Sequence, residues 1–273
     1  MAEKTYTSIE LRIADGIATL TFNLPQFGNA LHLKGVQETL DALYAAEARE
    51  DVGAVVLTGR GKAFCSGFNL KEIPAGELDV NAMSAHFRVL AMWWHQVLHL
   101  ITRIRKPVLA AVNGVAAGSG LGMTLCADMA VCKDTARFLP AWHTIGLAND
   151  ATTSYSLVKI VGFRKAMEWM MTNRTVSASE ALEMNLVNRV YDEASFDRNV
   201  ASIARQLADG PTHLQAMAKE GFHEGWRRSI EEATEHEIQN VMASVAHPYF
   251  ADALKKFLSG ERKSSHAQVK LPD

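Results

Sequence analysis

The sequence predicts an α/β protein in which an α/β core, over residues 1–200, precedes a helical region over 201–273. Apolar strand-like runs alternate with segments of helical periodicity as far as residue 150. This alternation indicates parallel strands joined by crossover helices. Beyond residue 150 the periodic segments are almost all helical, which marks the change to the C-terminal region.

The first predicted elements are a pair of strands, followed by helices and strands that alternate. Residues 8–13 and 17–22 each alternate polar and apolar side chains, and Asp15-Gly16 between them is a strong hairpin signal. The elements that follow, each predicted from its apolar spacing, are a helix over 33–49, a buried strand over 54–57, a helix over 82–104 and a strand over 107–112.

A glycine-rich segment, residues 113–122, follows that last strand directly and opens a helix that runs through Leu125. Free backbone N–H groups at the positive end of a helix dipole can stabilise an oxyanion or a phosphate. The Gly-x-Gly-x-Gly spacing of this segment differs from the dinucleotide-binding fingerprint. A tight turn that needs glycine for close packing is an equally good interpretation.

The remaining elements are mostly helices. A strand is predicted over 129–132 and a short one over 186–191. Helices are predicted over 151–160, 163–172, 178–185, 194–208, 212–243 and 248–258.

Composition excludes several classes of protein. Hydrophobic residues make up 48% and charged residues 21% of the chain, as in ordinary globular proteins. A net charge of −2 gives no reason to expect nucleic acid or a membrane as a partner. Cys65, Cys126 and Cys132 fit no metal-ligand spacing and indicate buried thiols in a reducing compartment. We therefore expect a cytoplasmic protein without a bound metal.

Asp150 is a candidate nucleophile. It ends the segment 140–150 as a lone carboxylate, eight residues after Trp142, and a single acid beside aromatic groups suggests a nucleophile in a dry pocket. Asp150 also precedes Ala-Thr-Thr-Ser, so an ordinary helix N-cap is the alternative. His95 and Trp142 could equally be core residues.

A second segment, residues 63–73, offers a partner for the glycine-rich turn. The backbone N–H of Phe68 could face that of Ser119, and an oxyanion hole needs two such donors at roughly 2.7–3.1 Å from the developing charge. An ordinary surface loop is the other interpretation of this segment.

Together these motifs resemble the crotonase (enoyl-CoA hydratase/isomerase) superfamily over nearly the whole chain. The matching residues are 24–25, 29–31, 64–68, 71–72, 107–122, 126–128 and Phe138. The resemblance implies a crotonase-like spiral of ββα units with a helical C-terminal trimerisation region that packs on neighbouring subunits, in a trimer or hexamer. It also implies an acyl-CoA thioester substrate held by the N–H groups of Phe68 and Ser119. The family commonly has glycine at the second position, so Ser119 is a departure.

A further departure separates this chain from the hydratases. The hydratase glutamates correspond to Gly122 and Trp142, so neither carboxylate is present. The chain is instead similar to the branch of the superfamily that dechlorinates 4-chlorobenzoyl-CoA. The segments that carry this similarity are 93–96, 141–146, 149–150, 154–157, 172–175, 211–215 and 237–241.

The resemblance to this branch implies a catalytic set. Asp150 would attack the aromatic ring and form an aryl ester, while the N–H of Trp142 holds its carboxylate. His95 would then activate water to hydrolyse that ester. No cofactor is implied, because coenzyme A is part of the substrate.

Substrate contacts follow from the same resemblance. The expected residues are Phe64, Gly67, Trp94, Gly118, Gly120, Gly28, Ala30, Lys71, Lys256 and Arg262. A solvated charged surface explains Lys256 and Arg262 equally well.

Two other functions stay open. One is another crotonase-type acyl-CoA enzyme, an enoyl-CoA isomerase or an aromatic thioester hydrolase, with Asp150 as a base. The other is a non-catalytic acyl-CoA-binding protein.

Overall fold

The larger of two sheets begins with the expected hairpin. The computed structural model describes residues 5–73, 79–260 and 271–272. Strands β1 (Ile9–Ala14) and β2 (Ile17–Phe22) pair antiparallel. The turn between them has Asp15 at φ 52° and Gly16 at φ 75°, the two left-handed residues that a tight hairpin requires.

Parallel strands complete this sheet. Its order is β1-β2-β3-β5-β7-β10, and every pair after the first hairpin is parallel. The added strands are β3 (Ala54–Gly59), β5 (Val108–Val112), β7 (Met129–Lys133) and β10 (Arg189–Tyr191). The predicted parallel α/β core is confirmed.

A second sheet was not predicted strand by strand. It contains β4 (Ala63–Cys65), β6 (Val115–Ala117), β8 (Arg137–Leu139) and β9 (Val176–Ser177) in that order. Strands of two or three residues are too short to show periodicity. Each of β3, β5 and β7 is followed by a short strand of this second sheet, so the implied spiral of ββα units is confirmed. Strand β6 also separates β5 from the glycine-rich turn, which we expected to be adjacent.

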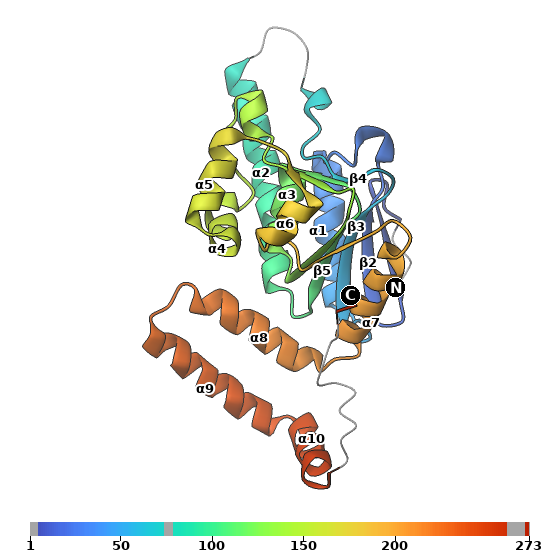
Figure 1. Cartoon of the computed structure of the whole chain (residues 1–273), viewed down its shortest axis with the longest axis vertical. Helices are drawn as coiled ribbons and strands as arrows, with labels where there is room; N and C mark the ends of the chain where they lie inside the picture. The colour runs from blue at the N-terminus through green and yellow to red at the C-terminus, as the bar shows by residue number, and fades with distance from the viewer. Residues whose placement is uncertain (1–4, 74–78, 261–270, 273) are drawn as a thin grey trace.

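Helices cover both faces of the large sheet (Figure 1). Helices α1 (Leu33–Glu47), α2 (Val80–Arg103) and α3 (Ser119–Cys126) contribute to the larger hydrophobic core. Helix α7 (Phe196–Ala208) packs on the opposite face, against alternate residues of β3 and β5. Every residue of α3 is buried, which holds its first turn firmly in the molecule.

The segment after Asp150 differs from the expected helix over 151–160. Ala151 and Thr152 both have positive φ, and a π-helix (Thr153–Leu157) and α4 (Val158–Val161) follow them. The next helices are α5 (Phe163–Thr172) and α6 (Ala178–Glu183). The chain thus reverses direction locally just after the candidate nucleophile.

The C-terminal helices form an arm that extends from the body (Figure 1). The single helix predicted over 212–243 is wrong: the arm has α8 (Thr212–Gly225), α9 (Ile230–Ala246) and α10 (Pro248–Leu258). Ser229 begins α9 with a capping box to Glu232, which explains the break. Helix α7 crosses residue 200 and packs on the sheet, so the helices outside the body begin at α8.

A buried ion pair fixes α8 to the body. The Lys219 ammonium lies 2.8 Å from the Asp128 carboxylate and also donates to the Ile101 carbonyl at 2.7 Å. Only 6% of the Lys219 side chain is exposed.

None of the helices in the described part of the chain combines the length and the apolar composition that a membrane span requires.

Candidate active site

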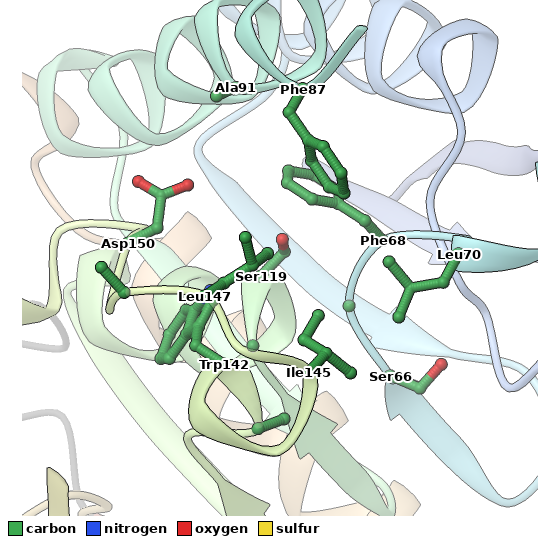
Figure 2. A pocket seen from close by; sticks show the side chains of 14 residues that line it. Ser66, Phe68, Leu70, Phe87, Ala91, Ser119, Trp142, Ile145, Leu147 and Asp150 are labelled. Atoms are coloured by element: carbon green, nitrogen blue, oxygen red, sulfur yellow. The ribbon is translucent and has the colours of Figure 1, made fainter. Parts of the chain in front are cut away.

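A cavity of about 320 Å³ lies between α2, the loop after β4 and the start of α3 (Figure 2). Its lining is mostly apolar, with Phe68 and Phe87 on one side and Trp142 and Asp150 on the other. The residues that line it are Ser66, Gly67, Phe68, Leu70, Phe87, Ala91, Gly118, Ser119, Ala141, Trp142, Ile145, Leu147, Ala148 and Asp150. Such a cavity suits a flat aromatic group.

Phe68 lines the cavity, and its backbone N–H is one candidate donor for the site. A parallel bridge joins Phe68 to Leu31, in which Leu31 N–H donates to the Gly67 carbonyl and Asn69 N–H donates to the Leu31 carbonyl. Successive N–H groups of an extended chain point to opposite sides, so the N–H of Phe68 points away from Leu31. It donates to no group in the part of the chain that the structure describes.

Ser119 supplies the second backbone donor. It is the first residue of α3, where N–H groups have no partner within the helix, and its own N–H donates to no described residue. A Cβ atom on Gly67 would lie 3.8 Å from the Ser119 nitrogen, so the two loops lie side by side. Gly67 and Gly118 have φ of 101° and 51°, values that glycine adopts without strain.

Asp150 is bonded to His95. The His95 Nε2 lies 2.7 Å from Asp150 Oδ1, and 40% and 33% of the two side chains are exposed. The helix position of His95 puts Ala91 and Phe87, four and eight residues earlier, on the same face of α2 toward the cavity. These two cavity residues were missed, although their spacing from His95 could have identified them.

The two side chains shift each other's pKa in opposite directions. The hydrogen bond that His95 donates to the Asp150 carboxylate raises the pKa of His95 above its ordinary value, against the effect of burial. Burial raises the pKa of Asp150, but the His95 bond and the N–H of Ala151 outweigh it, so the pKa lies below its ordinary value. At neutral pH these shifts favour a carboxylate paired with an imidazolium.

Two expectations for Asp150 are not met. Its side chain does not cap a helix: Thr152, not Asp150, precedes the π-helix, and no side chain caps it. Trp142 lines the cavity and is 6% exposed, but among the described residues no hydrogen bond joins its indole to Asp150. His95 holds the carboxylate instead, because α2 passes directly beside the 149–152 turn.

Gly122, which stands where a hydratase has one of its glutamates, is in close contact with the segment that carries Asp150. A Cβ atom on Gly122 would lie 2.5 Å from the Cβ of Ala151, closer than real contacts allow. Ala151 is 1% exposed and follows the candidate nucleophile. The segment that carries Asp150 therefore occupies the space in front of Gly122, and this conformation leaves no room for a side chain there.

Three expected substrate contacts are core residues. Phe64 is fully buried against Phe22, and Trp94 is fully buried behind Phe68, with the two rings 6.2 Å apart. Gly120 lets α3 approach β4, since a Cβ there would meet the Cys65 carbonyl at 2.1 Å. None of the three lines the cavity, so they shape its walls from behind.

The expected coenzyme A contacts are only partly assembled. Gly28, at φ 62°, accepts a hydrogen bond from the N–H of the cavity residue Ser66, and the buried Ala30 lies two residues further on. Lys71 is exposed in a 3₁₀ helix (Leu70–Glu72) beside the cavity. Lys256 lies on α10 in the arm, and Arg262 lies outside the described residues.

Leu70, Ile145, Leu147 and Ala148 also line the cavity and were not predicted. Single apolar residues in loops carry no periodic signal that could have identified them. No group of three or more metal-ligating side chains occurs in the described ranges.

The fold and this site define a member of a known family. A protein-family model described as enoyl-CoA hydratase/isomerase matches residues 12–267, and the chain belongs to that family. It is 50% identical over 271 residues to 4-chlorobenzoyl coenzyme A dehalogenase-2 of an Arthrobacter species, covering 99% of this chain and 98% of that relative.

Hydratases are more distant. The chain is 33% identical to a probable enoyl-CoA hydratase of Rhodobacter capsulatus, covering 96% of this chain and 98% of the relative. The solved structure of a putative enoyl-CoA hydratase from Streptomyces coelicolor superimposes with a TM-score of 0.87 at 28% identity, covering 95% of this chain and 94% of that structure.

Proposed function

We propose that the protein is a hydrolase acting on a carbon–halogen bond, which converts 4-chlorobenzoyl-CoA and water into 4-hydroxybenzoyl-CoA, chloride and a proton. The observation that carries this proposal is a single carboxylate, Asp150, at one side of an apolar cavity that Phe68 and Ser119 also line, whose backbone N–H groups donate to no described residue. The identity to the Arthrobacter dehalogenases over nearly the full chain supports the same reaction.

The thioester carbonyl serves as the electron sink. Its oxygen is conjugated through the ring with the carbon that bears chlorine, so negative charge that develops at that carbon reaches the oxygen. The N–H groups of Phe68 and Ser119 stabilise this charge, and the dipole of α3 adds to the effect. Serine in place of the family's common glycine at position 119 adds a side chain beside the donor, but the backbone N–H that donates is retained.

The first chemical step forms an aryl ester. An Asp150 oxygen attacks the ring carbon para to the thioester, and a C–O bond forms. The C–Cl bond then breaks, and chloride leaves with the bonding electron pair. Phe68, Phe87 and Trp142 surround the ring with apolar surface and exclude water from the charged intermediate.

The second step hydrolyses the ester. His95 removes a proton from water, whose oxygen attacks the carboxyl carbon of Asp150. The bond between that carbon and the aryl oxygen breaks, the aryl oxygen takes up one proton, and the second proton leaves to solvent. The reaction uses no metal or redox cofactor, since every group in it comes from the protein, the substrate or water.

Isotope labelling tests the covalent step. With enzyme in excess in ¹⁸O-water, a single turnover should give a product whose new oxygen comes from Asp150 and is unlabelled. After many turnovers the Asp150 carboxylate should carry ¹⁸O, detected in its peptide by mass spectrometry. Label in the first product would contradict the ester mechanism, because water would then have attacked the ring directly.

Two variants separate the roles of the pair. Asp150→Asn should release no chloride, whereas His95→Gln should release one equivalent and accumulate the aryl ester. Release of free coenzyme A, detected by its thiol, without release of chloride would favour a thioester hydrolase. Loss of enoyl absorbance would favour an isomerase. Binding without turnover in the wild-type protein would favour a non-catalytic acyl-CoA-binding protein.

We also propose that the arm assembles the protein into a homo-oligomer, a trimer or a hexamer. Helices α9 and α10 have no buried residues. On α9 the exposed apolar side chains recur at i, i+3, i+4 and i+7, which makes one continuous stripe: Ile238, Val241, Met242 and Val245. Such a stripe needs a covering partner in water.

A cytoplasmic location is the remaining part of the proposal. Cys65, Cys126 and Cys132 are free, buried thiols, a state that a reducing compartment preserves.

A further inference from the structure

Two consecutive residues after the nucleophile have an unusual backbone conformation. Ala151 has φ 54° and Thr152 has φ 65°, both in the left-handed region. Residues that have a Cβ atom rarely adopt this backbone conformation, and β-branched residues such as threonine adopt it least readily. Strain of this kind persists only where surrounding contacts enforce it, and it clusters at functional sites.

The enforcing contacts converge on the Thr152 side chain. Its Oγ1 lies 3.3 Å from Cys126 Sγ, at the last residue of α3, and accepts a hydrogen bond from Ser156 Oγ at 3.2 Å. The Thr152 carbonyl accepts from the Ser156 N–H at 2.7 Å. Cys126 and Ser156 are both buried, so this hydroxyl is tied to fixed parts of the body.

The turn held in this way sets the direction of Asp150. The Asp150 carbonyl accepts a hydrogen bond from the Thr153 hydroxyl at 2.7 Å and another from the Thr153 N–H at 3.2 Å. Ala151 itself rests on Gly122, as described above. Rotation of the backbone at Thr152 would break these two bonds and carry Asp150, with its carboxylate, away from His95 and the cavity.

We infer that Thr152 is a positioning residue for Asp150, whose hydroxyl, held by Cys126 and Ser156, maintains the left-handed turn that aims the carboxylate at both the cavity and His95. The kinetic part of this inference rests on the proposed function. The contact between Asp150 and His95 can be followed without any substrate.

Three substitutions at Thr152 separate its hydroxyl from its shape. Thr152→Val keeps the shape and removes the hydroxyl, Thr152→Ser keeps the hydroxyl, and Thr152→Gly removes both the hydroxyl and the strain. Thr172→Val is the matched control: the Thr172 hydroxyl is also hydrogen-bonded, in its case to the Glu168 carbonyl at 2.8 Å, but it lies on the exposed surface of α5. Thermal unfolding of each variant reports its stability.

The valine and glycine variants should form the aryl ester about tenfold more slowly or worse, since a misplacement of ~1 Å can cost ~100-fold. Their KM should stay within about twofold of the wild-type value, because the substrate-binding walls are untouched. Thr152→Gly should be at least as stable as the wild type while reacting slowly, because glycine relieves the strain. Thr152→Ser and Thr172→Val should react at nearly the wild-type rate.

The pKa of His95, followed by NMR titration without substrate, gives the second readout. It should fall in Thr152→Val and Thr152→Gly, as the carboxylate moves away, and stay unchanged in the other two variants. The inference is overturned if the rates simply follow stability, or if Thr152→Val keeps both its rate and its His95 pKa. If wild-type protein releases no chloride, the proposed function fails, and the titration alone still decides the role of Thr152.

Discussion

His95 and Asp150, 55 residues apart in the chain, share a 2.7 Å hydrogen bond, so the proposed base and nucleophile of one reaction contact each other in the free protein. Each shifts the pKa of the other toward its charged form, that of His95 upward and that of Asp150 downward. Formation of an aryl ester would neutralise Asp150 and remove the anion that raises the pKa of His95. The pKa of His95 would then fall, which favours the neutral imidazole at the stage where a base is needed.

Removal of the Asp150 charge should lower the pKa of His95. In Asp150→Asn the hydrogen bond to a carboxylate is lost while the lowering effect of burial persists. Histidine NMR titrations of wild type and variant would measure the difference. His213, on the arm, has a pKa lowered by burial and by His247, and it should not change. An unchanged His95 pKa would show that the pair is not coupled in solution.

The two chemical steps should respond differently to acid. Ester formation needs ionised Asp150, whose pKa lies below the ordinary value of about 3.9, so this step should persist in mild acid. Hydrolysis needs neutral His95 and should decline as the pH falls through the pKa of this imidazole. Acid-quenched mass spectrometry should therefore find more aryl enzyme at pH ~5 than at pH ~8. A parallel decline of both steps would contradict separate roles.

Gly122→Ala should displace the nucleophile. The added Cβ would lie 2.5 Å from Ala151, so the turn that carries Asp150 must move. We expect chloride release to fall about 100-fold and the free energy of unfolding to fall by about 1–3 kcal/mol. Gly221→Ala on α8 is the control, since its Cβ would meet nothing within 4 Å. Full activity in Gly122→Ala would show that the turn accommodates the methyl group.

Lys219→Met should destabilise the protein by about 3–5 kcal/mol, because it leaves the Asp128 carboxylate largely buried without its cation. Asp128→Asn combined with Lys219→Met removes both charges and should cost less than the sum of the single changes. Urea unfolding would measure all three variants. Additive losses would mean that the two side chains contribute independently.

Charges in the α9 stripe should disrupt assembly. Ile238→Glu with Met242→Glu places two carboxylates among side chains that are exposed in the single protomer. Light scattering should show a smaller particle than for the wild type. Gln239→Glu, exposed and outside the stripe, is the control for charge alone. An unchanged mass in the double variant would exclude this stripe as the interface.

Most of the large sheet and its helices could be predicted because each has a local signal. The hairpin has Asp15-Gly16, and the spacing of apolar residues located the helices that became α1 and α2. The second sheet has strands of two or three residues, which carry no such signal. The break in the arm was not predicted, because the apolar spacing continues across Ser229. The capping box at Ser229 nevertheless begins a new helix there.

For the site, the sequence by itself determined which residue types are available: one carboxylate in Asp150, an imidazole in His95, and glycines where two loops must approach. Only the tertiary structure decided how they meet. It paired Asp150 with His95 instead of Trp142, buried Phe64 and Trp94 behind the cavity wall, and turned the chain back after Asp150 through Thr152. The physical reason is that a side chain's partner depends on which distant segment packs beside it, and local spacing does not contain that information.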